Sequence, residues 1–153
     1  MKNLTLMQEL KPQLEEEGFA VFYKEADKDT AVDQLIVPIA KEDGTALNLE
    51  INTIDDPQGI YPVTEFVQCF IAIPIQINNE KIVEIYTLLN KINIELPMGG
   101  FYLHEAGIVF YKYTIVVHHD DREKILARLI DSIDISNHLF QNFESLIVEF
   151  ISA

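Results

Sequence analysis

The segment VTEFVQCFIAIPIQI, residues 63–77, predicts a long strand that is apolar on both of its faces. Side chains of a strand point alternately to opposite faces. One face therefore carries Val67, Cys69, Ile71, Ile73, Ile75 and Ile77. The opposite face carries Phe66, Phe70 and Ala72. A sheet with one face in water alternates cleanly between apolar and polar residues, so both faces of this strand need cover.

The segment GIVFYKYTIVV, residues 107–117, shows the same two-sided pattern. One face carries Val109, Tyr111, Tyr113, Ile115 and Val117, and the other carries Ile108, Phe110, Lys112, Thr114 and Val116. Three kinds of cover for the second face remain open: the C-terminal helical region, a second copy of the chain, or a partner protein. From the second faces of these two strands we select as candidate partner-binding residues Phe66, Phe70, Ile108 and Phe110.

The periodicity of the first half of the chain predicts a helix and then four strands. The N-terminal helix contains Pro12, which should kink or divide it. A strand over residues 19–25 is followed by a hairpin over residues 33–55 that turns at Asp43-Gly44. Pro38 lacks a backbone N–H, which places its strand at an edge or a bulge of the sheet. The two-faced strand of residues 63–77 is the fourth.

The second half predicts a helix, a second hairpin and a terminal helical region. The helix starts near Asn79, and the hairpin turns at residues 105–107. A carboxylate of Asp120 or Asp121 should cap the terminal helix. The polar stretch DISN, residues 134–137, interrupts its apolar stripe. We therefore expect one bent helix or two short ones at the C-terminus.

These elements define the expected fold class. Their order is α-β-β-β-β-α-β-β-α(α), with neighbouring strands joined by hairpins. Hairpin-connected strands and segregated helices indicate an α+β fold with an antiparallel β-sheet. The 153 residues show no linker or internal repeat, so we expect a single domain over residues 1–153.

The pair Gly99-Gly100 has two possible roles, a phosphate-holding loop or a structural corner. A phosphate loop follows a strand and opens a helix, whose N-terminus then faces the anion. Here the glycines follow a predicted helix and precede a predicted strand. This order favours a corner in which the glycines supply positive φ angles.

The polar motifs assign no catalytic, cofactor-binding or metal-binding residue. The run HHDD, residues 118–121, does not converge on one ion, because alternate strand residues point to opposite sides. His104 and His138 could supply further ligands only through the fold. No Gly-x-Ser-x-Gly motif is present, and Cys69 lies in an apolar run rather than an electropositive setting. We therefore expect no enzymatic activity and no cofactor.

Charge and cysteine content restrict the partners and the compartment. Eleven basic and twenty-five acidic residues give a net charge of −14, which repels nucleic acids and anionic membranes. The acidity either maintains solubility or attracts basic or aggregation-prone partners. One cysteine cannot form an internal disulfide, which is typical of a reducing compartment. The N-terminus does not resemble a signal peptide, so we expect a cytoplasmic protein.

The stretch NKINIELPMGGFYLHEAGIVFYKYTIVV, residues 90–117, resembles the YbjN-like proteins. That family pattern has a helix with asparagines, Leu-Pro-x-Gly-x-Phe, an acidic-Gly turn and an aromatic strand. The matching residues are Asn90, Asn93, Leu96, Pro97, Gly99, Phe101, Glu105, Gly107, Tyr111 and Tyr113, with Lys112 in the place of the usual arginine. The turn departs from the pattern, because it reads His-Glu-Ala-Gly and has one acidic residue instead of two.

The resemblance implies the fold of type III secretion chaperones such as the Tir chaperone. It also implies a small, acidic, often dimeric cytoplasmic protein that binds other proteins without catalysis. We therefore expect a non-enzymatic protein-binding module, chaperone-like or regulatory, that acts as a homodimer. The alternatives are a small-molecule or metal-binding sensor with a pocket between sheet and helices, and a structural protein that only dimerises.

Overall fold

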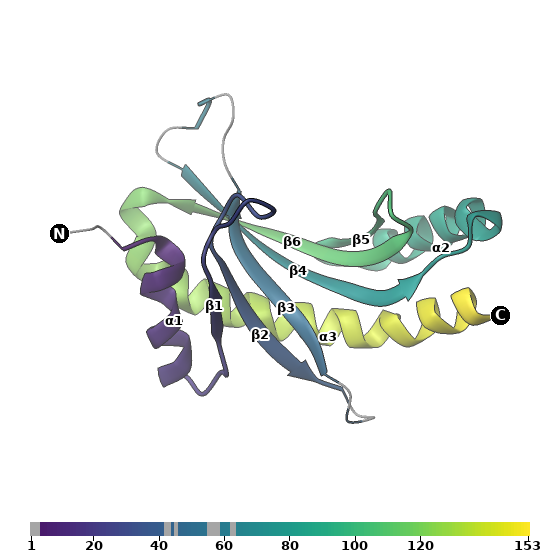
Figure 1. Ribbon diagram of the computed structural model, residues 1–153, viewed down its shortest axis with the longest axis horizontal. Coiled ribbons are helices and arrows are strands. Elements are labelled where there is room, and N and C mark those ends of the chain that lie inside the picture. Colours follow the sequence, from purple (N-terminus) through teal and green to yellow (C-terminus); the bar gives the residue numbers. More distant parts are fainter. Residues whose placement is uncertain (1–3, 42–43, 45, 55–58, 62–63) are drawn as a thin grey trace.

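Six antiparallel strands form one twisted sheet, with helices packed against one of its faces, in the computed structural model (Figure 1). The structure describes residues 4–41, 44, 46–54, 59–61 and 64–153. The helices are α1 (Leu6–Glu16), α2 (Ile82–Glu95) and α3 (Ile125–Ser152), with 3₁₀ turns η1 (Asn79–Lys81) and η2 (His119–Lys124). The strands are β1 (Phe22–Lys24), β2 (Gln34–Ala40), β3 (Ala46–Ile54), β4 (Thr64–Gln76), β5 (Gly100–Leu103) and β6 (Ile108–His118).

The sheet has the strand order β1-β2-β3-β4-β6-β5, and every neighbouring pair is antiparallel. The order of elements along the chain is the predicted one, and the α+β class with an antiparallel sheet is confirmed. The two strands that are apolar on both faces, β4 and β6, are neighbours in the sheet. The pairing shifts register between Ala72 and Gln76, where β4 bends away from the start of β6.

The hydrophobic core lies between the helices and the inner face of the sheet. This inner face carries the fully buried odd-numbered residues of β4, namely Val67, Cys69, Ile71 and Ile73. The helices supply Leu6, Met7, Leu10 and Leu14 from α1, Ile85, Leu89 and Ile92 from α2, and Leu129, Ile133, Phe140 and Ile147 from α3. Apart from the neighbours Leu6 and Met7, the members of each set are three, four or seven residues apart, which places each set on one side of its helix.

Several expectations for the N-terminal half are corrected or refined. Pro12 lies inside α1, but the helix is not divided there, and Thr5 and Gln8 form a capping box at its start. The strand predicted over residues 19–25 is shorter, because only Phe22–Lys24 pair with β2. Pro38 lies beyond the part of β2 that faces β1, as expected of a residue at an edge. Asp43, in the predicted turn, lies outside the described residues.

The C-terminal helical region is one helix of 28 residues, not two short ones. Its polar stretch DISN fits the amphipathic pattern, because Ser136 is buried beside the sheet while Asp134 faces solvent. The predicted carboxylate cap is not formed: Lys124 occupies the N-cap without a side-chain cap bond. Asp120 and Asp121 lie one turn earlier in η2, where the Asp121 carboxylate accepts from Lys124 Nζ at 3.0 Å.

The Gly99-Gly100 pair is a structural corner between α2 and β5. Gly99 has a φ of +67°, and a Cβ built on it would lie 2.5 Å from the Tyr111 hydroxyl and 2.7 Å from the Lys112 carbonyl oxygen. The Tyr111 hydroxyl donates to the Met98 carbonyl at 3.0 Å. Gly100 does not have a positive φ, which corrects the prediction for this residue. Its lack of a side chain instead makes room for the ring of Tyr102, which would lie 2.8–3.1 Å from a Cβ.

Asn93 in the last turn of α2 closes the outer edge of β5. Its Oδ1 accepts from the Phe101 N–H at 2.7 Å, and its Nδ2 donates to the Phe101 carbonyl at 2.9 Å. The side chain therefore makes the two bonds that another strand would make. Phe101 is fully buried, and its backbone groups would otherwise lack partners at the edge of the sheet. This pair explains why an asparagine precedes the Leu-Pro-x-Gly-x-Phe pattern.

Replacement of Gly99 by alanine should lower the free energy of unfolding by about 2–4 kcal/mol, because a positive φ and close contacts both oppose a Cβ. Gly18 is the matched control, since its φ is +96° and a Cβ there would meet nothing within 4 Å. Gly18→Ala should therefore cost only about 1 kcal/mol of backbone strain. Urea unfolding of both variants measures the difference, and equal losses would contradict the close-contact argument.

Replacement of Asn93 by alanine should lower the free energy of unfolding by about 2 kcal/mol or more, because a buried N–H and a carbonyl lose their partners. Asn90, one turn earlier on α2, is exposed, and Asn90→Ala should change stability by about 0.5 kcal/mol or less. Amide hydrogen exchange at Phe101 should also accelerate in Asn93→Ala alone. Unchanged exchange there would show that Asn93 does not close the edge.

Candidate functional site

The outer face of the sheet is not covered by any helix in the described part of the chain (Figure 1). In this view α3 runs behind β2 and β3, and the outer face is turned toward the reader. The α3 ring of Phe140 stacks on Phe101, which in turn contacts Tyr111 of the inner face. The hypothesis that the C-terminal helix covers the second face is therefore wrong, because its apolar stripe packs on the same face as α1.

Three aromatic rings and a lysine form a cluster on this outer face, which we call the aromatic cluster: Phe70, Phe110, Tyr102 and Lys112. The ring centroids of Phe70 and Phe110 are 4.9 Å apart, and those of Tyr102 and Phe110 are 5.7 Å apart. The Lys112 amino group lies 5.2 Å from the centroid of Tyr102, within the range of a cation–π contact. The cluster spans the strands β4, β6 and β5.

Strand register explains why these four side chains meet. Phe110 pairs with Tyr102 on one side, and Phe70 pairs with Lys112. On its other side Phe70 pairs with Glu50 of β3. Paired positions present their side chains to the same face, so Phe70 lies between an acidic and a basic residue. The result is an apolar centre with charged groups at its margin, an arrangement typical of protein interfaces.

The four candidate residues chosen from the sequence occupy three places. Phe70 and Phe110 lie side by side in the aromatic cluster. Phe66 lies near the other end of β4 and makes an edge-to-face contact with Tyr61, with centroids 5.8 Å apart. Ile108 starts β6, beyond the register shift and opposite Gln76. Their role in binding stays a prediction.

Sequence reasoning missed two members of the aromatic cluster. Tyr102 is 43% exposed and lies over Gly100, but the short segment FYLH showed no alternation that would select it. Lys112 was placed on the correct face but was not selected as a partner-binding residue. Only the pairing of β5 with β6 brings Tyr102 to Phe110 and to Lys112.

The surface of the described residues contains hollows at the following places. One of about 230 Å³ lies beside α1 and the β1–β2 loop, and includes Thr5, Ala26 and Asp33. One of about 260 Å³ lies between α2 and β5, and includes Tyr86, Asn90 and Tyr102. A third, of about 470 Å³, lies between β6 and the first half of α3. The second hollow adjoins the aromatic cluster, because both include Tyr102.

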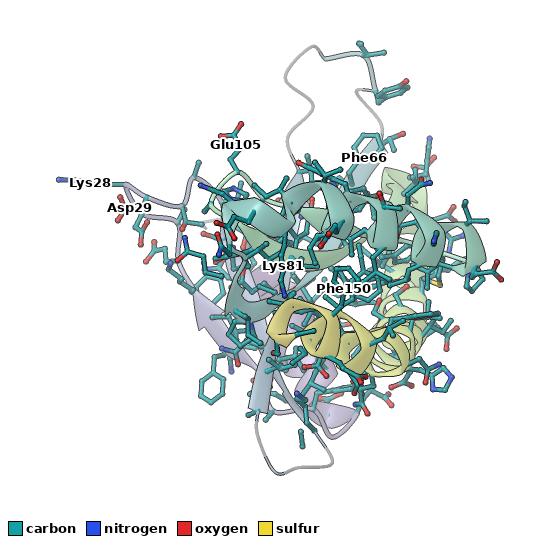
Figure 2. The ribbon with its side chains drawn as sticks, turned by 90° about the vertical axis from the view of Figure 1, so that its right-hand side faces the viewer. Lys28, Asp29, Phe66, Lys81, Glu105 and Phe150 are labelled. Atoms are coloured by element: carbon teal, nitrogen blue, oxygen red, sulfur yellow. The ribbon has the colours of Figure 1, made fainter. Side chains whose placement is uncertain are left out.

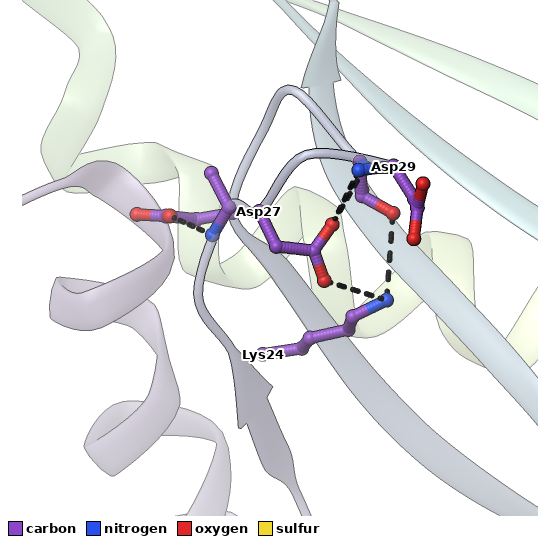
Figure 3. Close-up of polar contacts among 6 residues, drawn as sticks. Lys24, Asp27 and Asp29 are labelled. Carbon is purple, nitrogen blue, oxygen red and sulfur yellow. Dashed lines mark hydrogen bonds and ion pairs between the residues drawn. The ribbon is translucent and has the colours of Figure 1, made fainter.

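Acidic residues near β1 form hydrogen bonds that hold the β1–β2 loop together (Figure 3). The Asp27 carboxylate accepts from the N–H groups of Asp29 at 2.9 Å and Thr30 at 2.8 Å, and lies 3.8 Å from Lys24 Nζ. The Asp33 carboxylate accepts from the N–H of Ala26 at 2.9 Å. These backbone hydrogen bonds are the main reason that the pKa values of Asp27 and Asp33 lie below the ordinary range. Both groups stay ionised and hold the β1–β2 loop.

Two lysines make long-range contacts with α3. The Lys81 amino group donates to the carbonyls of Phe150, Ile151 and Ala153 at the end of the helix. Figure 2 labels Lys81 and Phe150. A cation at this end stabilises the helix through its free carbonyls. Lys41 pairs with the buried carboxylate of Glu144 at 2.7 Å. Both contacts tie distant segments to α3, and neither forms a cleft.

The remaining described side chains that could take part in nucleophilic or metal chemistry are Cys69 and the histidines. Cys69 is fully buried, and burial raises the pKa of its thiol to about 12, so it is not a thiolate near neutral pH. His118 Nδ1 lies 3.6 Å from an Asp120 carboxylate oxygen. Over the described residues, no three His, Cys, Asp or Glu side chains are grouped to hold a metal ion. None of the helices described there combines the length and hydrophobicity needed to cross a bilayer.

Comparison with known proteins now adds a family assignment to this geometry. A family model named YbjN, described as "Putative bacterial sensory transduction regulator", matches residues 9–145. The match runs from α1 through most of α3 and includes the whole sheet. A search of curated proteins found no match. Because the family model covers far more than half of the chain, the protein belongs to the YbjN family.

Proposed function

We propose that this chain is a non-enzymatic protein-binding module, chaperone-like or regulatory, that acts as a homodimer. The observation that carries the proposal is the uncovered outer face of the sheet, which carries the aromatic cluster on its strands β4, β6 and β5. Large apolar surfaces that remain exposed on a folded domain are typical of interaction sites. A few residues contribute most of the binding energy in such interfaces, and aromatic side chains are enriched among them.

The composition of the outer face supports binding of a protein rather than simple exposure to water. Exposed apolar side chains extend from the aromatic cluster in two directions, to Phe22 on β1 and to Val116 on β6, with exposed fractions of 61% and 56%. Between them lie half-buried apolar residues, among them Ile36 and Phe66. Covering these groups would gain about 25 cal/mol for each Å² of apolar area removed from water.

Net charge supports a preference among partners. The chain carries −14, so its field attracts basic proteins and repels acidic ones. An extended or helical segment with apolar anchors and basic flanks fits both the field and the aromatic cluster. Nucleic acids and anionic membranes are disfavoured by the same charge. The proposal places this binding in the cytoplasm.

The family supports the coarser part of the proposal. A regulator of sensory transduction acts by binding, and the description of the YbjN family names such a regulator. The chaperone-like part rests on the fold that the sequence resemblance implies, that of type III secretion chaperones, which hold client segments on apolar surfaces of a dimer. A fold does not by itself carry a function, so the partner has to be found by experiment.

The double variant Phe70→Ser with Phe110→Ser should lose partner binding, because it removes the centre of the aromatic cluster. Loss of two interface anchors that contribute about 1–2 kcal/mol each would weaken binding by roughly 30-fold or more. The measurement is capture from a native lysate of the source cells at several salt concentrations, followed by mass spectrometry and quantitation of the recovered partner.

The control is the double variant Val83→Ser with Ile94→Ser, which removes two apolar side chains from the outer side of α2. These side chains are 76% and 73% exposed. The control should keep the partner, and unfolding curves of both variants should show a folded chain. Failure to recover a stoichiometric protein at any salt concentration would overturn the proposal. A small ligand or ion found by native mass spectrometry of the fresh protein would favour the sensor alternative.

A further inference from the structure

The outer edge of β6 is free along its second half. β5 pairs only with Val109–Lys112, whereas β6 continues to His118. On this side of residues 113–118 no further strand is present in the described part of the chain. In Figure 1, β5 lies alongside only the right-hand part of β6, and α3 begins at the opposite end. An open edge of this kind exposes unpaired backbone groups that can pair with another strand.

Hydrogen bonding at the β5 edge determines which groups of β6 face outward. Asn93 holds the backbone groups of Phe101 on the outer side of β5. Antiparallel pairing alternates along a strand, so the groups of Gly100 and Tyr102 face β6 and meet Lys112 and Phe110. By the same alternation, the N–H and carbonyl groups at residues 114 and 116 point out of the sheet.

A contact from α3 supports this direction. The guanidinium of Arg128 donates to the Val116 carbonyl over 3.5 Å, which requires that carbonyl to point away from β4. The distance is at the long limit for a hydrogen bond, so the contact is weak and replaceable. Arg128 covers one of the four outward groups at residues 114 and 116, and it can be displaced by a better-aligned backbone donor.

The hollow of about 470 Å³ runs along this free edge. We call it the edge groove, and it is lined by Met98, Tyr113, Thr114, Ile115, Val116, Arg128, Asp131, Ser132 and Ile135. Two of its apolar residues are exposed to water, Val116 by 56% and Ile135 by 41%. Its charged residues are one cation, Arg128, and one anion, Asp131.

We infer that the edge groove is the homodimer interface, in which β6 pairs with β6 of a second copy, antiparallel and centred on Ile115. The inference rests on the homodimer of the proposed function and assigns its surface. In this register Thr114 of each copy lies opposite Val116 of the other. All four outward backbone groups of each copy then face partners, which is the narrow, hydrogen-bonded type of antiparallel pair.

Charge favours a second copy over a basic peptide as the occupant. A two-fold interface brings the same patch of each copy together, so every charge must meet its opposite within that patch. The edge groove satisfies this condition, because Arg128 of one copy can face Asp131 of the other. One charge of each sign gives the groove no excess charge that would select a basic segment, in contrast to the chain as a whole.

The first test is the mass in solution and its response to Thr114→Pro. The wild-type chain should sediment at twice its 17.5 kDa mass at about 100 µM, a concentration at which even a micromolar dimer is nearly complete. Proline at residue 114 removes an outward N–H without breaking a bond to β4, so the dissociation constant should rise by about tenfold or more.

The second test reverses the two charges of the edge groove in separate variants. Only pairing between two copies predicts that mixing these variants restores a dimer. Arg128→Asp and Asp131→Arg should each weaken the dimer, because each places like charges against one another. Mixing the two variants should restore a heterodimer, since every 128–131 contact then joins opposite charges. Both residues are exposed on α3, so these variants should fold even if Thr114→Pro does not.

The third test fixes the register. In Ile115→Cys the two introduced thiols lie opposite one another, at a separation suited to a disulfide, so mild oxidation should link the copies. The control Val83→Cys places a thiol on the outer side of α2, 76% of that valine being exposed, and should not link. The buried Cys69 does not interfere.

The inference is overturned if the wild-type chain is monomeric at this concentration. It is also overturned if the dimer is insensitive to both the proline and the charge variants. Partner capture by the Phe70 and Phe110 variants is measured separately. A monomer that still captures a protein through the aromatic cluster would refute the edge pairing and keep the protein-binding function. A dimer that captures no protein would keep the edge pairing and refute the protein-binding function.

Discussion

The two hydrogen bonds between the Asn93 side chain and the Phe101 backbone control much of this architecture. They close the outer edge of β5 with a side chain, so no seventh strand can pair there without displacing Asn93. They also fix the end of α2 against the sheet, next to the corner where Gly99 leaves no space for a Cβ. Because hydrogen bonding alternates along paired strands, the same two bonds determine that residues 114 and 116 direct their backbone groups outward.

Local patterns were sufficient for the order of elements and for the inner face of the sheet. The alternation of side chains along β4 and β6 identified the residues that are buried on the inner face. This was possible because the period of two residues along a strand does not depend on which strands pair with it. Boundaries were less predictable. β1 is shorter than its apolar run because only three residues find partners on β2. The stretch DISN did not break α3. Its buried residue is Ser136, which has a small side chain, and its acidic residue Asp134 faces solvent.

The candidate site was only half predictable. Phe70 and Phe110 could be chosen from the sequence because each places a large aromatic ring on the second face of a strand whose first face is already apolar. Tyr102 could not, because its membership depends on the pairing of a four-residue strand with β6 and on the missing side chain at Gly100. The location of α3 was equally undetermined, since an amphipathic helix fits either face of a sheet that is apolar on both. Which face stays open is a property of the whole fold.

The open face and the free edge are compatible in one assembly. Antiparallel pairing at the edge of β6 has its two-fold axis perpendicular to the sheet, so it would join two sheets side by side and leave both outer faces on the same side. Two aromatic clusters would then be available to one partner, and the second contact would be intramolecular once the first has formed. A weak apolar contact at each cluster could thereby give firm binding of a long segment. The homodimer would increase the affinity for its partner without contributing any further contact of its own.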